Sequence, residues 1–288
     1  MSIRVKDLFD KNTNTLTYIV YDPNAKDAIV IDPVLDFNSA AGKISFESIE
    51  KILTFVLEHQ LNVKYILETH AHADHLTGAQ FLKKKLPGSL VGINSNISIV
   101  QETFNKVLNL KHVKIDGSQF DILLDEDNVL DVGTFEIQTI FTPGHTPACS
   151  SFLIDGHLFT GDAIFMPDSG TGRCDFPKGS AKDLYHSIHE KLYKLPDDTK
   201  IYVGHDYQPE GRELMFQTTI GEQKEKNIQL TQSTSEADYI EFRTKRDEIL
   251  DAPKLLLPSI QINIDAGKLP PAEENEVRYL KLPISEKI

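Results

Sequence analysis

The segment from Thr69 to His75 constrains the fold of this 288-residue chain more than any other. The segment follows an apolar run and contains four potential metal ligands, His70, His72, Asp74 and His75. Side chains alternate in an extended backbone, so His70 and His72 point to the same side, and the other two follow as the chain turns. All four can therefore reach one small volume. Imidazole and carboxylate groups together suit zinc, iron or manganese.

Three further potential ligands stand singly, each after an apolar, strand-like run and a glycine. They are His145, Asp162 and His205, which follow Gly144, Gly161 and Gly204. Glycine permits unusual backbone angles and a close approach of the chain, and loops on a rigid scaffold suit such residues. Without a metal, a buried cluster of these side chains would contain costly unpaired polar groups. The pattern therefore predicts a metal site at the ends of several strands.

Hydrophobic periodicity predicts strands and helices in both halves of the chain. Strands are expected at 16–21, 28–31, 63–67, 120–124, 128–130, 134–142, 150–154, 157–160 and 200–203, and a loop at 34–44. The clearest helix is expected from Ser45, as its N-cap, to Gln60, because the apolar residues between them form one stripe. Further helices are expected at 79–86, 97–108 and 181–195. This order fits a sandwich of two sheets with helices outside.

We expect a single domain over residues 1–288, in which 211–288 form a helical and extended C-terminal extension. A helix capped by Ser235 is predicted to run towards Leu250. Prolines punctuate the end of the chain, which favours an extended tail laid over the domain and not a second core.

The composition argues against several classes of partner and location. The net charge is −13, so the chain lacks the basic footprint that binding to nucleic acid requires. No apolar run approaches membrane-spanning length and no secretory signal is visible, so we expect no membrane association and a cytoplasmic location. The two cysteines, Cys149 and Cys174, do not suggest a disulfide framework, and we expect them to be packing residues.

The run His70-x-His72-x-Asp74-His75, together with His145, Asp162 and His205, resembles the metallo-β-lactamase superfamily. The resemblance implies an α+β fold, the αββα sandwich, in which two mixed β-sheets are flanked by helices and the metal lies at one edge between the sheets. It covers about the first 210 residues. Its motifs are specific for the superfamily but not for one reaction, because hydrolases, nucleases and oxygenases share them.

Narrower motifs resemble the persulfide dioxygenase (sulfur dioxygenase) family, especially its bacterial β-lactamase hydrolase-like branch. They are Val34-Leu35-Asp36-Phe37, Asp162-Ala163-Ile164-Phe165, Gly172-Arg173-Cys174-Asp175-Phe176, Gly204-His205-Asp206-Tyr207 and Leu255-Leu256-Leu257-Pro258-Ser259-Ile260. This resemblance implies a non-haem mononuclear iron oxidoreductase of sulfide detoxification, which oxidises glutathione persulfide with O2 to sulfite and glutathione. The segment Met166–Thr171 is slightly longer than in the mitochondrial-type enzymes, so the shape of the substrate pocket is expected to differ there.

Carried over residue by residue, the resemblance implies one Fe(II) per chain, with His70, His145 and Asp162 as its ligands and catalytic residues. The remaining members of the motif would hold waters and orient those ligands. These members are His72, Asp74, His75 and His205.

Two residues are candidates for binding the substrate. Arg173 suits the carboxylates of an acidic tripeptide, and its alternative role is a structural salt bridge, for example with Asp175. Tyr207 could hydrogen-bond near the iron, and its alternative is a place in the core. The family is also compatible with a homodimer.

Two other functions are compatible with the same donors. A binuclear zinc thioester hydrolase of the glyoxalase II kind would place His70, His72 and His145 on one metal, Asp74, His75 and His205 on the other, and Asp162 between them. A non-catalytic binding or sensor module is the third reading. It is disfavoured because no donor is missing.

Overall fold

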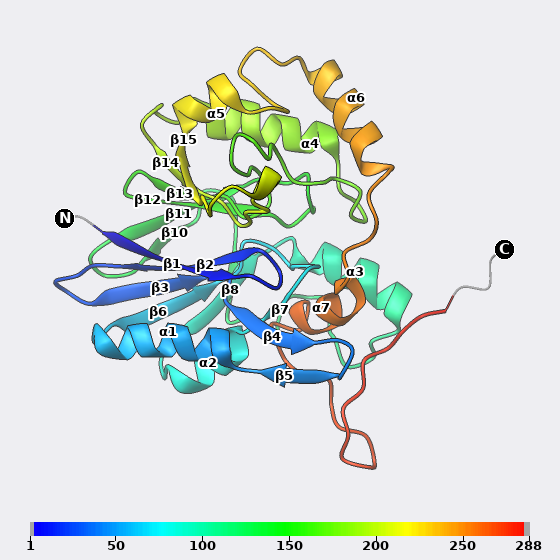
Figure 1. Ribbon diagram of the computed structural model, residues 1–288. Helices are drawn as coiled ribbons and strands as arrows, with labels where there is room; N and C mark the ends of the chain where they lie inside the picture. The colour runs from blue at the N-terminus through cyan, green and yellow to red at the C-terminus, as the bar shows by residue number, and fades with distance from the viewer. Residues whose placement is uncertain (1–2, 285–288) are drawn as a thin grey trace.

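In the computed structural model, which describes residues 3–284, two six-stranded β-sheets pack face to face between layers of helices (Figure 1). The first sheet has the order β1-β2-β3-β6-β8-β9. Its strands are β1 (Arg4–Asp10), β2 (Thr15–Tyr21), β3 (Asp27–Ile31), β6 (Asn62–Leu67), β8 (Leu90–Asn94) and β9 (Ile122–Leu124). The first three strands are antiparallel, and β3, β6, β8 and β9 are parallel.

The second sheet has the order β10-β11-β12-β13-β14-β15, in which only the β13–β14 pair is parallel. Its strands are β10 (Val129–Asp131), β11 (Glu136–Phe141), β12 (Ser150–Ile154), β13 (His157–Phe159), β14 (Lys200–Tyr202) and β15 (Gln217–Thr219). Both sheets are therefore mixed, and the predicted sandwich is confirmed.

Aromatic and aliphatic side chains fill the space between the sheets. Tyr18 of the first sheet meets Phe159 of the second edge to face, with ring centroids 5.2 Å apart. Its hydroxyl donates a hydrogen bond to the carbonyl of Val203 (2.7 Å), and the Leu16 amide donates to the carbonyl of Gly204 (2.9 Å). These bonds join the two sheets beside the segment that carries His205.

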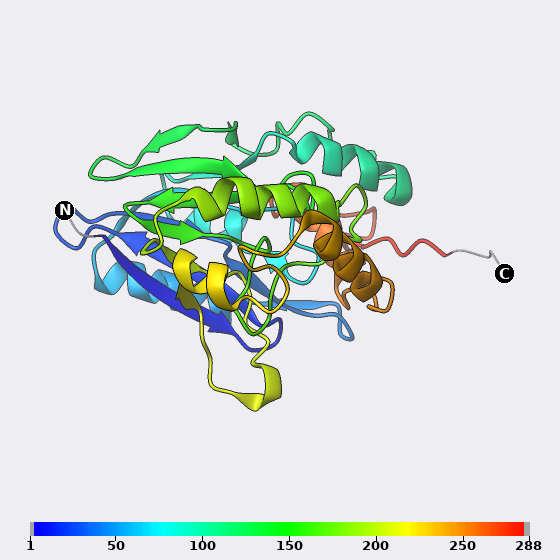
Figure 2. The same cartoon turned by 90° about the horizontal axis from the view of Figure 1, so that it is seen from above.

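In the described part of the chain, seven α-helices cover the sandwich. They are α1 (Glu47–Glu58), α2 (Ala79–Lys85), α3 (Ile97–Leu108), α4 (Ala181–His186), α5 (Ile220–Lys226), α6 (Glu236–Asp247) and α7 (Leu256–Asn263). Figures 1 and 2 show α1 and α2 on the outer side of the first sheet and α4, α5 and α6 on the side of the second. Within residues 3–284, no helix is long and apolar enough to cross a membrane.

The start of α1 differs from the prediction. The apolar stripe of Ile49, Ile52 and Val56 is buried as expected, but Ser45 is not the N-cap. Ser45 instead pairs with Asp36 in a small third sheet, so the predicted loop at 34–44 is also wrong. That sheet consists of β4 (Val34–Asn38), β5 (Lys43–Ser45) and β7 (Leu76–Thr77). Strand β4 pairs with β7, which lies after the histidine run. Local periodicity cannot reveal such a distant partner.

The helix predicted at 181–195 has the expected apolar stripe but not one regular winding. After α4, the chain forms a π-helical turn (Ser187–Lys191) and a 3-10 turn (Leu192–Lys194). At this change the buried Ser187 hydroxyl donates a hydrogen bond to the carbonyl of Pro143 (2.7 Å). The irregular turn therefore fastens the helix to the segment that carries His145.

The C-terminal region contributes to both halves of the sandwich. Ser235 caps α6 as predicted, because its hydroxyl accepts the amide of Asp238. The stretch expected to be an extended tail instead contains α7, with Pro258 in its first turn, where proline is tolerated. Ile260 and Ile262 of this helix are buried in the core beneath the first sheet. Strand β15 adds an edge to the second sheet.

Candidate metal centre

All seven predicted donors meet between the two sheets, at the ends of the strands that precede them. His70 follows β6, His145 follows β11, Asp162 follows β13 and His205 follows β14. The histidines and Asp162 are buried, whereas Asp74 is half-buried. The strand-end arrangement expected from the sequence is thus present, and it brings side chains from both sheets together.

The first candidate ligand group consists of His70, His145 and Asp162, whose potential ligand atoms all lie within 4.8 Å of one another. The Asp162 Oδ2 atom is 3.6 Å from His145 Nε2 and 4.0 Å from His70 Nε2. His70 Nε2 and Asp162 Oδ1 are buried without a hydrogen-bond partner. Such orphaned atoms are costly unless a ligand satisfies them, so the group fits a metal cation.

The other ring nitrogens of this group are held by hydrogen bonds that leave Nε2 free. His145 Nδ1 lies 2.7 Å from the carbonyl of Arg173, which can only accept, so this nitrogen carries the proton. The Thr69 hydroxyl donates to Asp32 (2.7 Å) and lies 3.0 Å from His70 Nδ1, which must then be the donor in that contact. Both tautomers therefore present the Nε2 lone pair to the centre.

The second candidate group consists of His72, Asp74 and His75. His72 Nε2 lies 3.0 Å from Asp32 and 3.3 Å from Glu68. His75 Nδ1 lies 3.2 Å from Asp74. The remaining nitrogens, His72 Nδ1 and His75 Nε2, are buried and have no hydrogen-bond partner, so this group could also accept a cation.

His205 lies between the two groups. Its Nε2 atom is 3.3 Å from Asp162 Oδ1 and 3.4 Å from Asp74 Oδ2. Its Nδ1 atom lies 3.1 Å from the carbonyl of Asn14. A proton on Nε2 would be shared by two carboxylates, whereas a neutral Nε2 could bind a metal.

Burial and neighbouring charges set the pKa values of these groups in opposite directions. Burial lowers the pKa of His70 well below its usual value, and His72 and His145 lower it further, so His70 is neutral, as a ligand must be. Burial also acts to lower the pKa of His72, but Asp32 and Glu68 outweigh it and raise the pKa well above the usual value. The same contact lowers the pKa of Asp32 in spite of its burial.

Two functional positions were not predicted from the sequence. Asp32 appeared only as the end of a strand, yet it accepts hydrogen bonds from the Thr69 amide and hydroxyl and lies against His72. The buried Asn263 of α7 donates to the carbonyls of His72 and His75, both at 2.8 Å. Nothing local in the sequence indicates these long-range contacts, although Asp32-Pro33 at a strand end is a weak signal.

Two recesses open from the first ligand group. The first has a volume of about 490 Å³ and reaches from the β1–β2 turn to Lys254 and Leu255. The second has a volume of about 380 Å³ and reaches to Arg243, Arg246 and Leu250. Asp162, Arg173 and Tyr207 line both recesses.

The structure places both predicted substrate residues on the wall between these recesses. The Arg173 guanidinium donates to both carboxylate oxygens of Asp175, and its Nη1 donates to the carbonyl of Asp251 (2.8 Å). Tyr207 is half-exposed and stacks on His205, with ring centroids 5.6 Å apart. Arg173 thus has protein partners already, and Tyr207 borders the recess and not the core.

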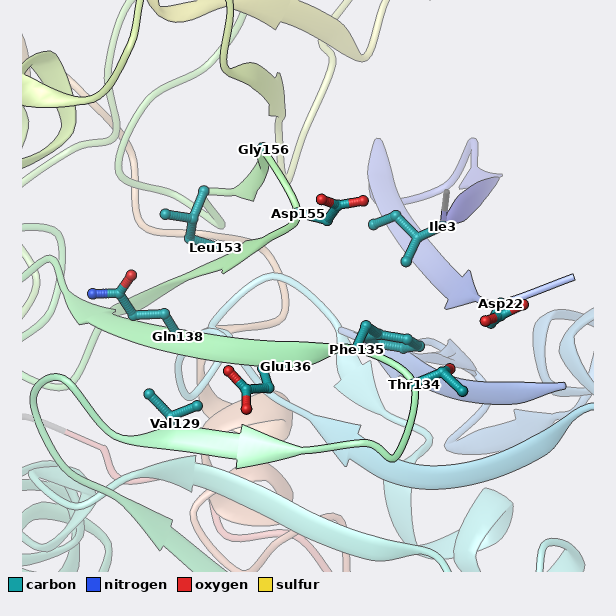
Figure 3. A pocket seen from close by; sticks show the side chains of 10 residues that line it. All are labelled: Ile3, Asp22, Val129, Thr134, Phe135, Glu136, Gln138, Leu153, Asp155 and Gly156. Carbon is teal, nitrogen blue, oxygen red and sulfur yellow. The ribbon is translucent and has the colours of Figure 1, made fainter. Parts of the chain in front are cut away.

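A larger hollow, of about 650 Å³, lies at the other end of the sandwich (Figure 3). Its lining includes the hairpin turn at Asp155 and Gly156 and the side chains of Asp22 and Glu136. It contains acidic groups but no histidine or cysteine, so it offers little of the donor chemistry found between the sheets.

The cysteines lie outside the reactive centre. Both are buried and free, and burial raises the pKa of Cys149 to about 12 and that of Cys174 above its usual value. A thiol needs to ionise to act as a nucleophile, so these residues are suited to packing, as predicted.

Comparison with known proteins agrees with this geometry. A family model described as the metallo-beta-lactamase superfamily matches residues 11–205. A protein named Glyoxylase B2 from Dictyostelium discoideum is 45% identical over 269 residues, which cover 93% of this chain and 92% of that protein. The human protein named Persulfide dioxygenase ETHE1, mitochondrial, is 34% identical over 236 residues, which cover 81% of this chain and 78% of that protein.

Among solved structures, the crystal structure of ETHE1 from Myxococcus xanthus aligns with a TM-score of 0.74 at 29% sequence identity. The alignment covers 93% of this chain and 100% of that chain, so the similarity includes the C-terminal region. A relative named as a glyoxylase and relatives named as persulfide dioxygenase or ETHE1 are thus all similar to this chain over most of its length.

Proposed function

This chain belongs to the metallo-beta-lactamase superfamily, and we propose that it is an iron-dependent persulfide dioxygenase that converts glutathione persulfide and O2 to sulfite and glutathione. The observation that carries the proposal is the separation of the donors into two groups. His70, His145 and Asp162 form a compact set of two histidines and one carboxylate. Such a set is typical of non-haem iron oxygenases.

The residues present fit this metal. Two neutral imidazoles and one carboxylate would hold the ion, and their orphaned atoms would find the partner that the protein does not supply. An iron(II) ion held by these residues would supply the activation of O2 beside the persulfide sulfur. His72 is engaged through Nε2 by Asp32 and Glu68, which supports a positioning role for it.

The protein's own groups would position the substrate and move protons. One persulfide, one O2 and one water give one thiol and one sulfurous acid, so the atoms balance and the terminal sulfur supplies the electrons. Tyr207 lines the recess beside His145 and Asp162, so its hydroxyl can donate a hydrogen bond to the substrate there. His205 can hold a proton between Asp74 and Asp162.

A second candidate is a binuclear zinc thioester hydrolase of the glyoxalase II kind. It is favoured by the orphaned nitrogens of His72 and His75, which would bind a second metal, and by the position of Asp162 between the groups. The similarity to Glyoxylase B2 also supports it. Two zinc ions held by these residues would supply the activation of a water molecule for hydrolysis of a thioester.

Metal content and turnover, measured on protein purified without added metal, distinguish the two candidates. We expect about one iron per chain and uptake of O2 with glutathione persulfide, and neither in the Asp162→Ala variant. About two zinc ions per chain with hydrolysis of a glutathione thioester would instead establish the hydrolase. If the metal-loaded protein turned over neither substrate, it would be a binding or sensor module.

A further inference from the structure

We propose that the two recesses bind the two carboxylate-bearing ends of a substrate whose sulfur lies in the middle of the molecule. Lys254 would bind one carboxylate in the first recess and Arg246 the other in the second. This inference rests on the proposed function, because it takes a sulfur compound as the substrate. It adds the residues that would select the thiol compound carrying that sulfur.

The two recesses share one wall, where the sulfur would lie. Asp162, Arg173 and Tyr207 belong to both linings, and Asp162 is a member of the first ligand group. A ligand that fills both recesses must therefore branch beside this carboxylate. A peptide with cysteine at its centre has that shape, because the side chain and the two flanking arms leave the same Cα atom.

Most cations that line the recesses already have partners. Arg173 is held by Asp175 and by the carbonyl of Asp251. Arg243 is buried and bound to Asp247 (2.7 Å) and to the side-chain oxygen of Gln229 (3.0 Å). Arg243 cannot turn to a ligand without leaving the buried Asp247 unpaired, and Arg173 would have to give up both oxygens of Asp175 and the carbonyl of Asp251.

Arg246 and Lys254 are the cations that remain in the two linings. Across residues 3–284, the structure has no hydrogen bond or ion pair to the charged group of either one. Both side chains are exposed at the surface. Unpaired surface cations are common, but these two stand at the outer parts of recesses that begin at the ligand group.

The overall charge makes these two positions more important for an anionic ligand. The chain has a net charge of −13, so its mean field repels a dicarboxylate. A local cation at each end would offset that repulsion and fix the orientation of the ligand. The first recess is the larger, at about 490 Å³ against about 380 Å³, so we assign the longer arm to Lys254 and the shorter to Arg246.

The segment between the two cations is fixed by Arg173. Leu250 lines the second recess and Leu255 the first, and the carbonyl of Asp251 between them accepts the hydrogen bond from Arg173. Arg173 would therefore act as a positioning residue that sets the spacing of Arg246 and Lys254.

Binding of S-methylglutathione to the metal-containing protein tests the proposal by titration calorimetry. This probe has a γ-glutamyl arm and a shorter glycyl arm but no reactive sulfur. We expect Arg246→Ala and Lys254→Ala each to weaken binding by about three- to tenfold, as for partly exposed charged contacts. Lys245→Ala is the matched control, because Lys245 lies on α6 beside Arg246 but pairs with Glu241. The affinity of this variant for S-methylglutathione should equal that of the parent protein.

The assignment of the arms is tested with S-methyl-cysteinylglycine, which lacks the γ-glutamyl arm. Arg246→Ala should weaken its binding as much as before, whereas Lys254→Ala should have no effect. Parent-like affinity of both variants for S-methylglutathione, or an effect of only one, would overturn the two-armed arrangement. Because no turnover is measured, this result is independent of whether the protein oxidises persulfides or hydrolyses thioesters.

Discussion

At the scale of single residues, Asp32 shows how one buried carboxylate can determine the state of two histidines. Through the Thr69 hydroxyl it makes His70 donate from Nδ1, and by direct contact it engages Nε2 of His72. His70 is thereby prepared as a neutral ligand, and His72 is drawn towards the charged form. Two histidines separated by a single alanine thus have different chemical environments.

This difference predicts unequal effects of substitution on metal binding. His70→Ala should lower the iron content by more than about tenfold, because it removes a ligand, whereas His72→Ala should keep the iron bound. Metal content per chain, measured by plasma mass spectrometry, tests this, with the exposed His112→Ala as control. Equal loss of metal from His70→Ala and His72→Ala would contradict the mononuclear assignment.

The sequence alone identified the seven side chains that meet between the sheets, but not the groups that orient them. Each donor follows an apolar strand, so its type and local context are visible in the chain. Asp32 and Asn263 act on the histidine run from 40 and 191 residues away, counted to His72. No local spacing encodes such contacts, because they arise only when the sheets pack together.

At the scale of elements, the position of His145 depends on the packing of α4 against a glycine. A Cβ atom on Gly144 would lie 2.5 Å from the backbone nitrogen of Leu184, and the residue has a φ of +142°. The same helix is fastened to Pro143 through Ser187. The Pro143–His145 turn and α4 therefore form one unit.

Gly144→Ala should therefore be much more harmful than an alanine at another glycine of positive φ. We expect it to destabilise the fold by more than about 2 kcal/mol and to lower metal content, because α4 must move. Gly156→Ala is the control, since it has a φ of +74° but no atom within 4 Å, and it should cost about 1 kcal/mol. Urea denaturation measures both, and equal losses would refute this account.

A second element-level unit joins the loops on either side of the centre. Arg212 donates to both carboxylate oxygens of the fully buried Asp206, at 2.7 Å each, and also binds Asp168. Asp206 lies between His205 and Tyr207 in the chain. The ion pair therefore anchors the loop whose residues border the ligand groups.

Arg212→Ala should lower the free energy of unfolding by about 3 kcal/mol, because it leaves a buried carboxylate without its cation. Lys226→Ala, which breaks an exposed pair with Glu222, should cost less than about 0.5 kcal/mol. Chemical denaturation at neutral pH tests both values. Similar values for the two variants would mean that Asp206 is satisfied without Arg212.

The ion pair of Arg212 with Asp168 gives a pH dependence with a definite sign. The hydrogen bond from Arg212 lowers the pKa of Asp168 in the folded protein. The ion pair therefore contributes fully to stability at pH values above the pKa of Asp168 in the unfolded chain, which is about 3.9. This contribution is lost as the pH falls through the lower pKa of Asp168 in the folded protein. The difference in stability between parent and Arg212→Ala should therefore shrink below about pH 4.

At the scale of the whole molecule, the metal would join the two halves of the sandwich. His70 follows a strand of the first sheet, and His145 and Asp162 follow strands of the second. Removal of the metal by a chelator should thus lower the melting temperature, by about 5–10 °C if the free metal is near 100 times its Kd. Calorimetry tests this, and readdition of metal should restore the value. The His70→Ala variant should not respond to the chelator, and a response of equal size would place the stabilising ion elsewhere.

The layered architecture could be predicted, whereas the course of the C-terminal region could not. Alternation of strands and helices indicates two sheets with helices outside. Helix α7 escaped prediction because Pro258 and its neighbouring prolines are typical of extended chain. Its burial against the first sheet comes from tertiary packing, which overrides the local preference.

The contact between Asn263 and the histidine run has a consequence for how the protein is made. The carbonyls of His72 and His75 and the amide of Thr77 receive their partner, Asn263, from 186 to 191 residues further along the chain. On the ribosome, the run emerges long before this partner does, with its backbone groups still open to water. The ligand loop can reach its final form only after Asn263 has left the ribosome, so loading of the metal would follow the synthesis of α7.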